Sequence, residues 1–430
     1  MNRNPVEVCA VQERSPRVTE RPSLTHVALT LLAVLGLALF VLACRPSWSP
    51  DGQKVLYSYW DEGAQKSVVA LFDRKLRSTR VVFEWADEDS ADMQSLSAQW
   101  SRDGKSELVI TQKGDSLRIM AVPVAVAMPI QDFTLRGMGD GPIIPIPELR
   151  KQLFLSGEKK LVRINLDTGE IFKKEFAESQ NCLLFDAGGT LLYLREKSEK
   201  PPVAETKAAE TQPQKENIEA YELGELDQND LSFHPTLTLP REMMKEKGIG
   251  DLTGMLDANP ADLRIAVVAE SLGGKSDRIL ILGKNGIERS LELGLNQKAS
   301  EIGNPQWSRD AKLLYVSVLI PNEAAKQTTF AVLELPLDGK SSRIDRIEER
   351  ADKEYDSDFL GSAQIALSPD GKLIAVSNGR LKNVRAETKG LFLLDVSQPK
   401  RPVSFYPAPT LPTVAQKPAE KPEAKPAGKE

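Results

Sequence analysis

A short turn signature that recurs along the chain decides what kind of fold it can form. It reads WSPDG at residues 48–52 and WSRDG at residues 100–104, with the variants WSRDA at 307–311 and LSPDG at 367–371. Asp accepts hydrogen bonds from nearby backbone and Gly adopts a left-handed conformation without a Cβ clash, so each copy predicts a tight hairpin. Ala311 replaces this Gly and should cost about 1 kcal/mol if its position is left-handed. The apolar run after each turn predicts a strand.

Three weaker copies keep the same distance from turn to strand, at residues 147–148, 185–188 and 260–261. A second turn follows later in several units, as at residues 166–169 and 337–339. Two turns and three or four strands per unit describe a blade of a β-propeller. The Trp before the turn is expected to pack against the neighbouring blade.

The spacing of the copies agrees with the length of a blade. Counted at the Asp position of the signature, the seven copies fall at residues 51, 103, 148, 187, 261, 310 and 370. Successive copies are therefore 52, 45, 39, 74, 49 and 60 residues apart, against ~40–50 for a typical blade. The sequence predicts an all-β fold, a β-propeller over residues 45–406, with seven blades favoured over six or eight.

Two stretches and the C-terminus have compositions that cannot build a core. Residues 196–219 are rich in Lys, Glu, Pro, Ala and Thr and predict a disordered insertion. A second, acidic insertion is expected at residues 348–358; it is interpreted as a solvated surface loop rather than a Ca²⁺ site. Residues 407–430 form a Pro/Ala/Lys/Glu tail that is predicted to be disordered.

The WSPDG turn followed by an apolar strand resembles the WD40-like repeats of TolB-type bacterial propellers. The resemblance covers residues 46–406, with four strong copies and three weak ones. It implies the fold rather than the function, since such blades serve unrelated functions. True WD40 repeats are disfavoured, because their Gly-His dipeptide needs histidines and His234 is the only one after residue 26.

The N-terminal segment predicts membrane targeting. Residues 27–43 (VALTLLAVLGLALFVLA) carry no charge, and a helix of that length nearly crosses a ~30 Å hydrocarbon core. Arginines precede the segment, which favours a cytoplasmic location for that flank and an extracytoplasmic location for everything after Cys44.

Residues 41–44 (VLAC) resemble the lipobox of bacterial lipoproteins. The resemblance implies that Cys44 carries a diacylglycerol and becomes the mature N-terminus, so residues 1–44 would be a signal peptide with a lipobox. Two alternatives stay open: an uncleaved signal anchor, which would suit the long stretch before the apolar run, and an ordinary cleaved signal peptide. All three place the body outside the cytoplasm, on the periplasmic face or the surface of a bacterium.

The composition argues against several classes of function. A net charge of −5 without a basic stripe is unsuited to nucleic acid. Cys182 is the only cysteine after Cys44, and His234 is the only imidazole of the body, which removes most zinc sites and acid–base schemes. We therefore expect no catalytic residue, no metal and no cofactor.

One segment imitates two catalytic motifs. Residues 269–276 (AESLGGKS) match a loose phosphate loop, and Ser271 within them imitates a nucleophile elbow. Both motifs need a helix to follow, whereas DRILIL at residues 277–282 predicts a strand. The segment is therefore interpreted as a hairpin without nucleotide.

The leading hypothesis is a membrane-anchored extracytoplasmic propeller that acts as a scaffold for envelope protein partners. The alternatives are a binding protein for polysaccharide or a small ligand, and a propeller hydrolase or lyase that uses channel carboxylates. Exposed channel aromatics would favour sugar binding, and clustered carboxylates with shifted pKa values would favour an enzyme.

Overall fold

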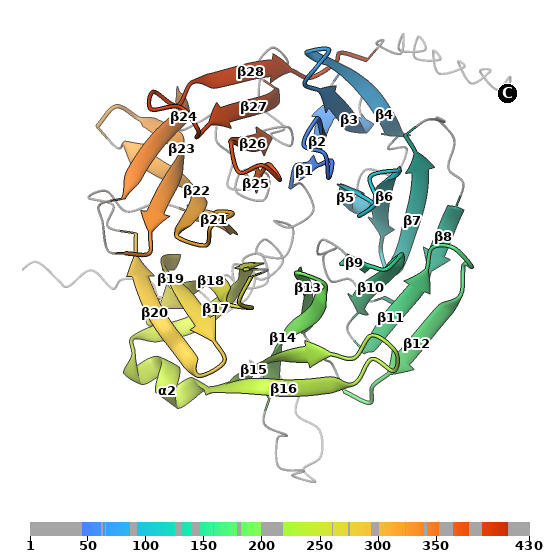
Figure 1. Ribbon diagram of the computed structural model, residues 1–430, viewed down its shortest axis with the longest axis vertical. Coiled ribbons are helices and arrows are strands. Elements are labelled where there is room, and N and C mark those ends of the chain that lie inside the picture. Colours follow the sequence, from blue (N-terminus) through green and yellow to red (C-terminus); the bar gives the residue numbers. More distant parts are fainter. Residues whose placement is uncertain are drawn as a thin grey trace, which may run out of the picture.

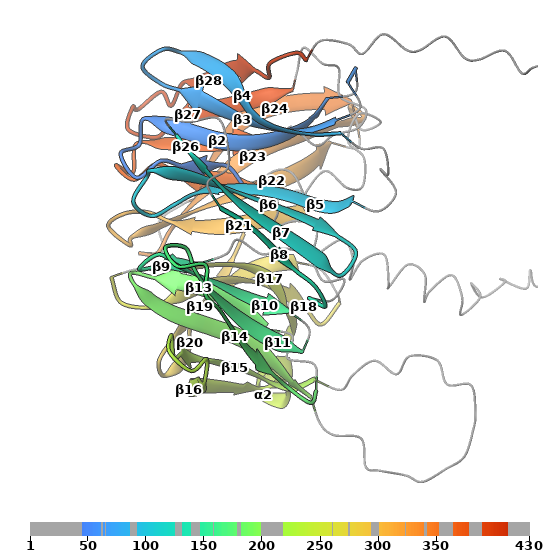
Figure 2. The same ribbon diagram turned by 90° about the vertical axis from the view of Figure 1, so that its right-hand side faces the viewer.

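The computed structural model is a ring of seven four-stranded antiparallel sheets (Figure 1), which has the shape of a disc when it is seen from the side (Figure 2). The prediction of an all-β, seven-bladed propeller is confirmed. The structure describes residues 45–61, 63–64, 66–86, 93–124, 131–138, 147–157, 159–178, 182–198, 218–259, 261–273, 276–293, 301–322, 324–338, 342–351, 364–377 and 389–411.

Each blade consists of four consecutive strands, the first at the axis and the last at the rim (Figure 1). Blades 1 to 4 contain β1 (Ser47–Trp48), β2 (Lys54–Asp61), β3 (Lys66–Asp73), β4 (Ser78–Ala86); β5 (Met93–Trp100), β6 (Ser106–Lys113), β7 (Ser116–Pro123), β8 (Gln131–Leu135); β9 (Glu148–Leu149), β10 (Gln152–Gly157), β11 (Lys160–Asn165), β12 (Ile171–Glu175); and β13 (Cys182–Ala187), β14 (Thr190–Ser198), β15 (Ile218–Leu226), β16 (Phe233–Pro240). Blades 5 to 7 contain β17 (Ile249–Ala258), β18 (Ile265–Ser271), β19 (Ser276–Gly283), β20 (Gly286–Glu292); β21 (Glu301–Trp307), β22 (Leu313–Asn322), β23 (Gln327–Pro336), β24 (Arg343–Ala351); and β25 (Ile365–Leu367), β26 (Leu373–Ser377), β27 (Gly390–Asp395), β28 (Val403–Pro407). A short helix, α2 (Arg241–Glu246), connects blades 4 and 5.

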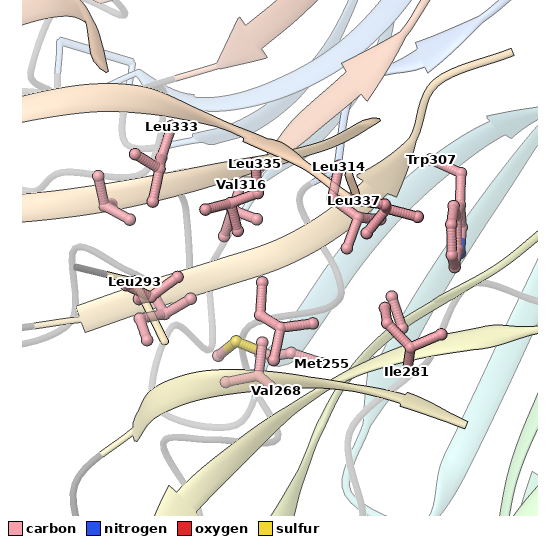
Figure 3. Close-up of a cluster of buried hydrophobic side chains, with 14 of the residues drawn as sticks. Met255, Val268, Ile281, Leu293, Trp307, Leu314, Val316, Leu333, Leu335 and Leu337 are labelled. Carbon is pink, nitrogen blue, oxygen red and sulfur yellow. The ribbon is translucent and has the colours of Figure 1, made fainter. Parts of the chain in front are cut away.

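The apolar cores lie between neighbouring blades. Middle strands such as β3 are buried along almost their whole length, as continuous apolar runs predict. Figure 3 shows one such core, where Val268 and Ile281 of blade 5 face Leu314, Val316 and Leu333 of blade 6. Full burial of each of these side chains contributes about 1.5–3 kcal/mol.

The four strong copies of the signature fold into the same turn. In each, the Ser hydroxyl donates to the Asp carboxylate at 2.6–2.8 Å and accepts, at 2.9 Å, the N–H that begins the second strand. The residue after the Asp is left-handed in all four, with φ between +57° and +71°: Gly52, Gly104, Ala311 and Gly371. The Asp residues therefore form the turns, as predicted, and the Ala311 position is left-handed.

The predicted turn of blade 3 was placed wrongly, and the predicted turn of blade 4, residues 185–188, begins too early and overlaps the observed turn only at Gly188. Glu148 belongs to β9 and Ala187 belongs to β13. In both blades the chain turns after these residues, in a two-residue hairpin. These hairpins contain Arg150 and Lys151 in blade 3, and Gly188 and Gly189 in blade 4, all with positive φ. A two-residue turn of this kind needs φ > 0 at both positions and no Ser–Asp pair, so the turn signature is absent from the sequence there.

Several predicted boundaries also need correction. The ends of the predicted insertion, residues 196–198 and 218–219, are paired strand residues, while 199–217 lie outside the described residues. Residues 348–351 likewise belong to β24. The predicted tail begins too early, because β28 ends at Pro407 and Leu411 is buried, at 7% exposure, against blade 1. Residues 412–430 lie outside the described residues.

The connections divide between two faces of the disc, because successive strands are antiparallel. The turn face carries the connections from first to second and from third to fourth strand of each blade, and the longest of them are 124–130 and 396–402. The loop face carries the other connections, including the long ones at 136–147, 199–217, 352–364 and 378–389.

The predicted membrane-targeting segment, with Cys44, precedes the first described residue. Within the described residues, no helix has the length and apolar character needed to cross a membrane.

Candidate functional site

A cavity of about 420 Å³ lies at the axis of the ring, between the innermost strands of blades 1 to 6. It lies near the turn face, because Trp48, Trp100 and Ala258, which end their strands there, line it. Its charged or amide side chains include Arg45, Arg102, Glu148, Asp186, Asp257 and Asn304.

Glu148, Arg102 and Asp186 link three blades along one side of the cavity. The Glu148 carboxylate accepts the backbone N–H of Arg102 at 2.7 Å. The Arg102 guanidinium lies 3.3 Å from a carboxylate oxygen of Asp186. Burial raises the pKa of Glu148, and the Arg102 N–H only partly opposes this. These charges are therefore already engaged in holding blades 2, 3 and 4 together.

Asp257 plays the same part between blades 5 and 6. Its carboxylate accepts the backbone N–H of Trp307 at 2.9 Å, and its backbone carbonyl accepts the Trp307 indole N–H at 3.1 Å. Loss of solvent raises the pKa of Asp257, against the opposing effects of Arg45 and of the backbone N–H groups. Arg45 in turn donates to the side-chain oxygen of Gln306.

The tryptophans of the signature connect neighbouring blades, as their position predicted. The indole N–H groups of Trp48, Trp100 and Trp307 donate at 2.8–3.1 Å to carbonyls of the preceding blade, with blade 7 preceding blade 1. The three side chains are only 8%, 7% and 5% exposed. Because their faces are covered, these rings cannot stack on a sugar in the channel.

Asn304 is the polar group of the cavity that is left unsatisfied. Its side chain is 1% exposed, and its Oδ1 has no hydrogen-bond partner among the described residues. A buried acceptor without a donor costs about 1–3 kcal/mol. The Oδ1 itself has almost no accessible surface, so this cost belongs to the packing of the cavity wall.

The residues singled out in the sequence do not come together. Residues 269–276 form the β18–β19 hairpin, so the phosphate-loop interpretation is excluded. Ser271 lies in blade 5, whereas His234 lies on β16 in blade 4, with its Nε2 3.2 Å from the Ser232 hydroxyl. Cys182 is buried, which raises the pKa of its thiol to about 12. In the described part of the chain, no three His, Cys, Asp or Glu side chains are grouped to hold a metal.

The cavity residues were missed because they lie far apart in the chain. The position of some of them within their strands is a signal that could have identified them. Asp186 and Asp257 each stand one residue before the end of an innermost strand, which lies at the axis.

Comparisons with known proteins identify the fold. No family model and no curated protein matches the sequence. A solved protein from Lactobacillus plantarum superposes with a TM-score of 0.50 and 12% identity, over 82% of this chain and 95% of that chain. The Dos1 propeller superposes with a TM-score of 0.44 and 11% identity, over 86% of this chain and 87% of that chain. The dihydro-heme d1 dehydrogenase NirN gives 0.40 and 13%, over 71% of this chain and 58% of NirN.

At these identities the likeness concerns the fold alone. The chain is a seven-bladed β-propeller with a polar axial cavity.

Proposed function

We propose that this protein is a scaffold of the bacterial cell envelope that is held at the membrane by its N-terminus and docks a protein partner on the loop face. The TolB-type resemblance of the repeats and the lipobox-like sequence at Cys44 support the extracytoplasmic, membrane-anchored part of the proposal.

The proposal that a partner docks on the loop face rests on a difference between the connections of the two faces. On the turn face, the connections are short and five of the seven first hairpins share one strand-to-strand register. On the loop face, four connections differ strongly in length and composition from the rest. Variable connections on a rigid ring are where recognition residues concentrate.

The cavity supports binding over catalysis. Each of its three carboxylates already accepts a hydrogen bond or ion pair that joins two blades. A glycosidase needs two carboxyl groups free to face a substrate at roughly 5–10 Å. The three buried tryptophans of the signature offer no ring face for a polysaccharide, and the aromatic side chain that lines the cavity with partial exposure is Phe185.

Site-specific photo-crosslinking in cells tests the docking face. Ala325 lies in the β22–β23 turn on the loop face and Ala261 in the β17–β18 turn on the turn face, and both are exposed. A photoreactive amino acid at position 325 should give a defined protein adduct, and the same amino acid at position 261 should not. Adducts from position 261 alone, or from neither position, would contradict the proposal.

Mass spectrometry of the protein purified from membranes tests the anchor. A diacylglyceryl group on Cys44 with loss of residues 1–43 is the expected result. An intact N-terminus in the membrane fraction would instead support the uncleaved anchor, and a soluble protein that begins near residue 45 would overturn membrane attachment.

The axial cavity of about 420 Å³ favours a second candidate, the binding of a small ligand beside Asn304. The test is a thermal-shift screen of amino acids and envelope sugars against the wild type and Asn304→Leu. A compound that raises the melting temperature of the wild type alone supports this function. The absence of any such compound argues that water occupies the cavity.

A further inference from the structure

Arg45, the first described residue, lies inside the ring. The strand that follows it, β1, belongs to blade 1, yet the Arg45 guanidinium donates to Gln306 on β21 of blade 6. It also lines the axial cavity together with Asp257 of blade 5. The side chain therefore joins blade 1 to blade 6 on the inside of the ring, past the inner edge of blade 7.

The strand that follows Arg45 is much shorter than its counterparts. Trp48 is the second residue of β1, whereas the corresponding Trp307 is the seventh residue of β21. Counted back from these tryptophans, Arg45 stands level with Asn304. The remaining residues of β21, 301–303, continue roughly 10 Å further toward the loop face at ~3.3 Å per residue.

The direction of β1 fixes which face its N-terminal end points to. β1 runs toward the connection at 49–53 on the turn face, so its N-terminal end points to the loop face. The cores that join blade 1 to blades 7 and 2 flank this strand, since Trp48, Val55 and Leu56 are buried in them. The backbone at Arg45 is therefore directed along the inside of the ring toward the loop face.

We infer that the loop face is the membrane-proximal face of the propeller, with the ring axis directed at the bilayer. This rests on the proposed attachment at or before Cys44, one residue from Arg45, which leaves too short a spacer for the ring to turn its other face to the bilayer. A partner docked on the loop face is accordingly a protein at the bilayer surface. The turn face, with its five hairpins of common register, points away from the membrane.

The test uses full-length protein reconstituted in liposomes that contain a headgroup-attached fluorescence quencher. Ala325→Cys on the loop face and Ala261→Cys on the turn face form a matched pair for a thiol-reactive dye, in a Cys9→Ala background. Cys182 will not react, because it is buried and its pKa of about 12 keeps the thiol protonated. The background protein without an introduced cysteine reports any labelling of Cys44.

The two labels should differ clearly. An eight-residue strand separates the faces by roughly 25 Å, so the dye at position 325 should be quenched several-fold more than the dye at position 261. Equal or reversed quenching in protein that floats with the liposomes would overturn the orientation and leave the anchor intact. Protein that does not float with the liposomes would overturn the anchor and, with it, the orientation.

Discussion

Glu107 shows at the scale of one residue what the packed ring demands of a charge. It lies on β6 beside Trp100, and its side chain is only 1% exposed. Its nearest cation is the half-exposed Arg80, with an N–O distance of 3.4 Å. Burial raises the pKa of Glu107 to about 6, and Arg80 and Lys54 oppose this only in part. The buried environment of Glu107 therefore favours the protonated carboxyl group over the carboxylate.

This predicts a defined pH dependence for Glu107→Gln. Because the folded pKa lies above the unfolded one, the contribution of Glu107 to stability is full below about pH 4.5 and is lost as the pH rises through 6. The variant should be about 2 kcal/mol more stable than the wild type near pH 8 and closely similar near pH 4.5. Urea unfolding at the two pH values measures this. Glu84→Gln, at an exposed ion pair with Lys66, should change stability by less than about 1 kcal/mol at both.

Ala311 supports a second prediction at this scale. Its φ of +57° is the conformation that Gly adopts in the equivalent turns at residues 52, 104 and 371. Ala311→Gly should therefore stabilise the fold by about 0.5–1 kcal/mol. This is the strain of a left-handed alanine, which the variant relieves, minus the conformational entropy that glycine adds to the unfolded chain. The reciprocal Gly371→Ala should destabilise it by a similar amount in denaturant unfolding. A destabilised Ala311→Gly would show that the turn tolerates a Cβ.

At the scale of elements, the sequence predicted the turns and strands that depend on local composition. The Ser–Asp turns at residues 49–51 and 308–310 have a recognisable composition, and the strands after them are apolar. The two-residue turn at 150–151 has no such composition, so its position depends on pairing within the blade. The axial cavity could not be predicted, since ring closure alone brings residues as distant as Arg45 and Asn304 to one place.

The connection between β14 and β15 gives the prediction for an element. Replacing residues 199–217 by a two-residue Asn-Gly turn should not lower the melting temperature and should raise stability by up to about 2 kcal/mol, because the flanking strands keep their pairing from Glu196 to Ser198 while the loop to be closed becomes shorter. Loop closure changes by only about 0.6 kcal/mol for each halving of length. A Gly/Ser segment of the original length is the control. A large loss of stability in both variants would show that residues 199–217 contribute to the core.

Closure of the ring is a property of the whole molecule. Each blade is formed by consecutive strands, so blade 7 meets blade 1 through side chains and loop contacts rather than through a shared sheet. Trp48 donates its indole N–H to Ala366, and Ser377 donates its hydroxyl to the carbonyl of Ser58. Residues 408–411 then cross from blade 7 onto blade 1. Closure therefore depends on a few residues that the sequence pattern assigned to the tail.

Truncation at two positions distinguishes these residues from the rest of the C-terminus. Removal of residues 412–430 should leave the melting temperature unchanged. Removal of residues 408–430 should cost about 3 kcal/mol, because it exposes the buried surface of Leu411 and breaks the two hydrogen bonds that join this segment to blade 1. These are the bond from the Tyr59 hydroxyl to Pro409, 2.6 Å, and the bond from the Leu411 N–H to Asp61, 3.1 Å. Leu411→Ala in the full chain should reproduce about 2 kcal/mol of the loss in denaturant unfolding, and equal stability of the two truncations would show that the ring closes without this segment.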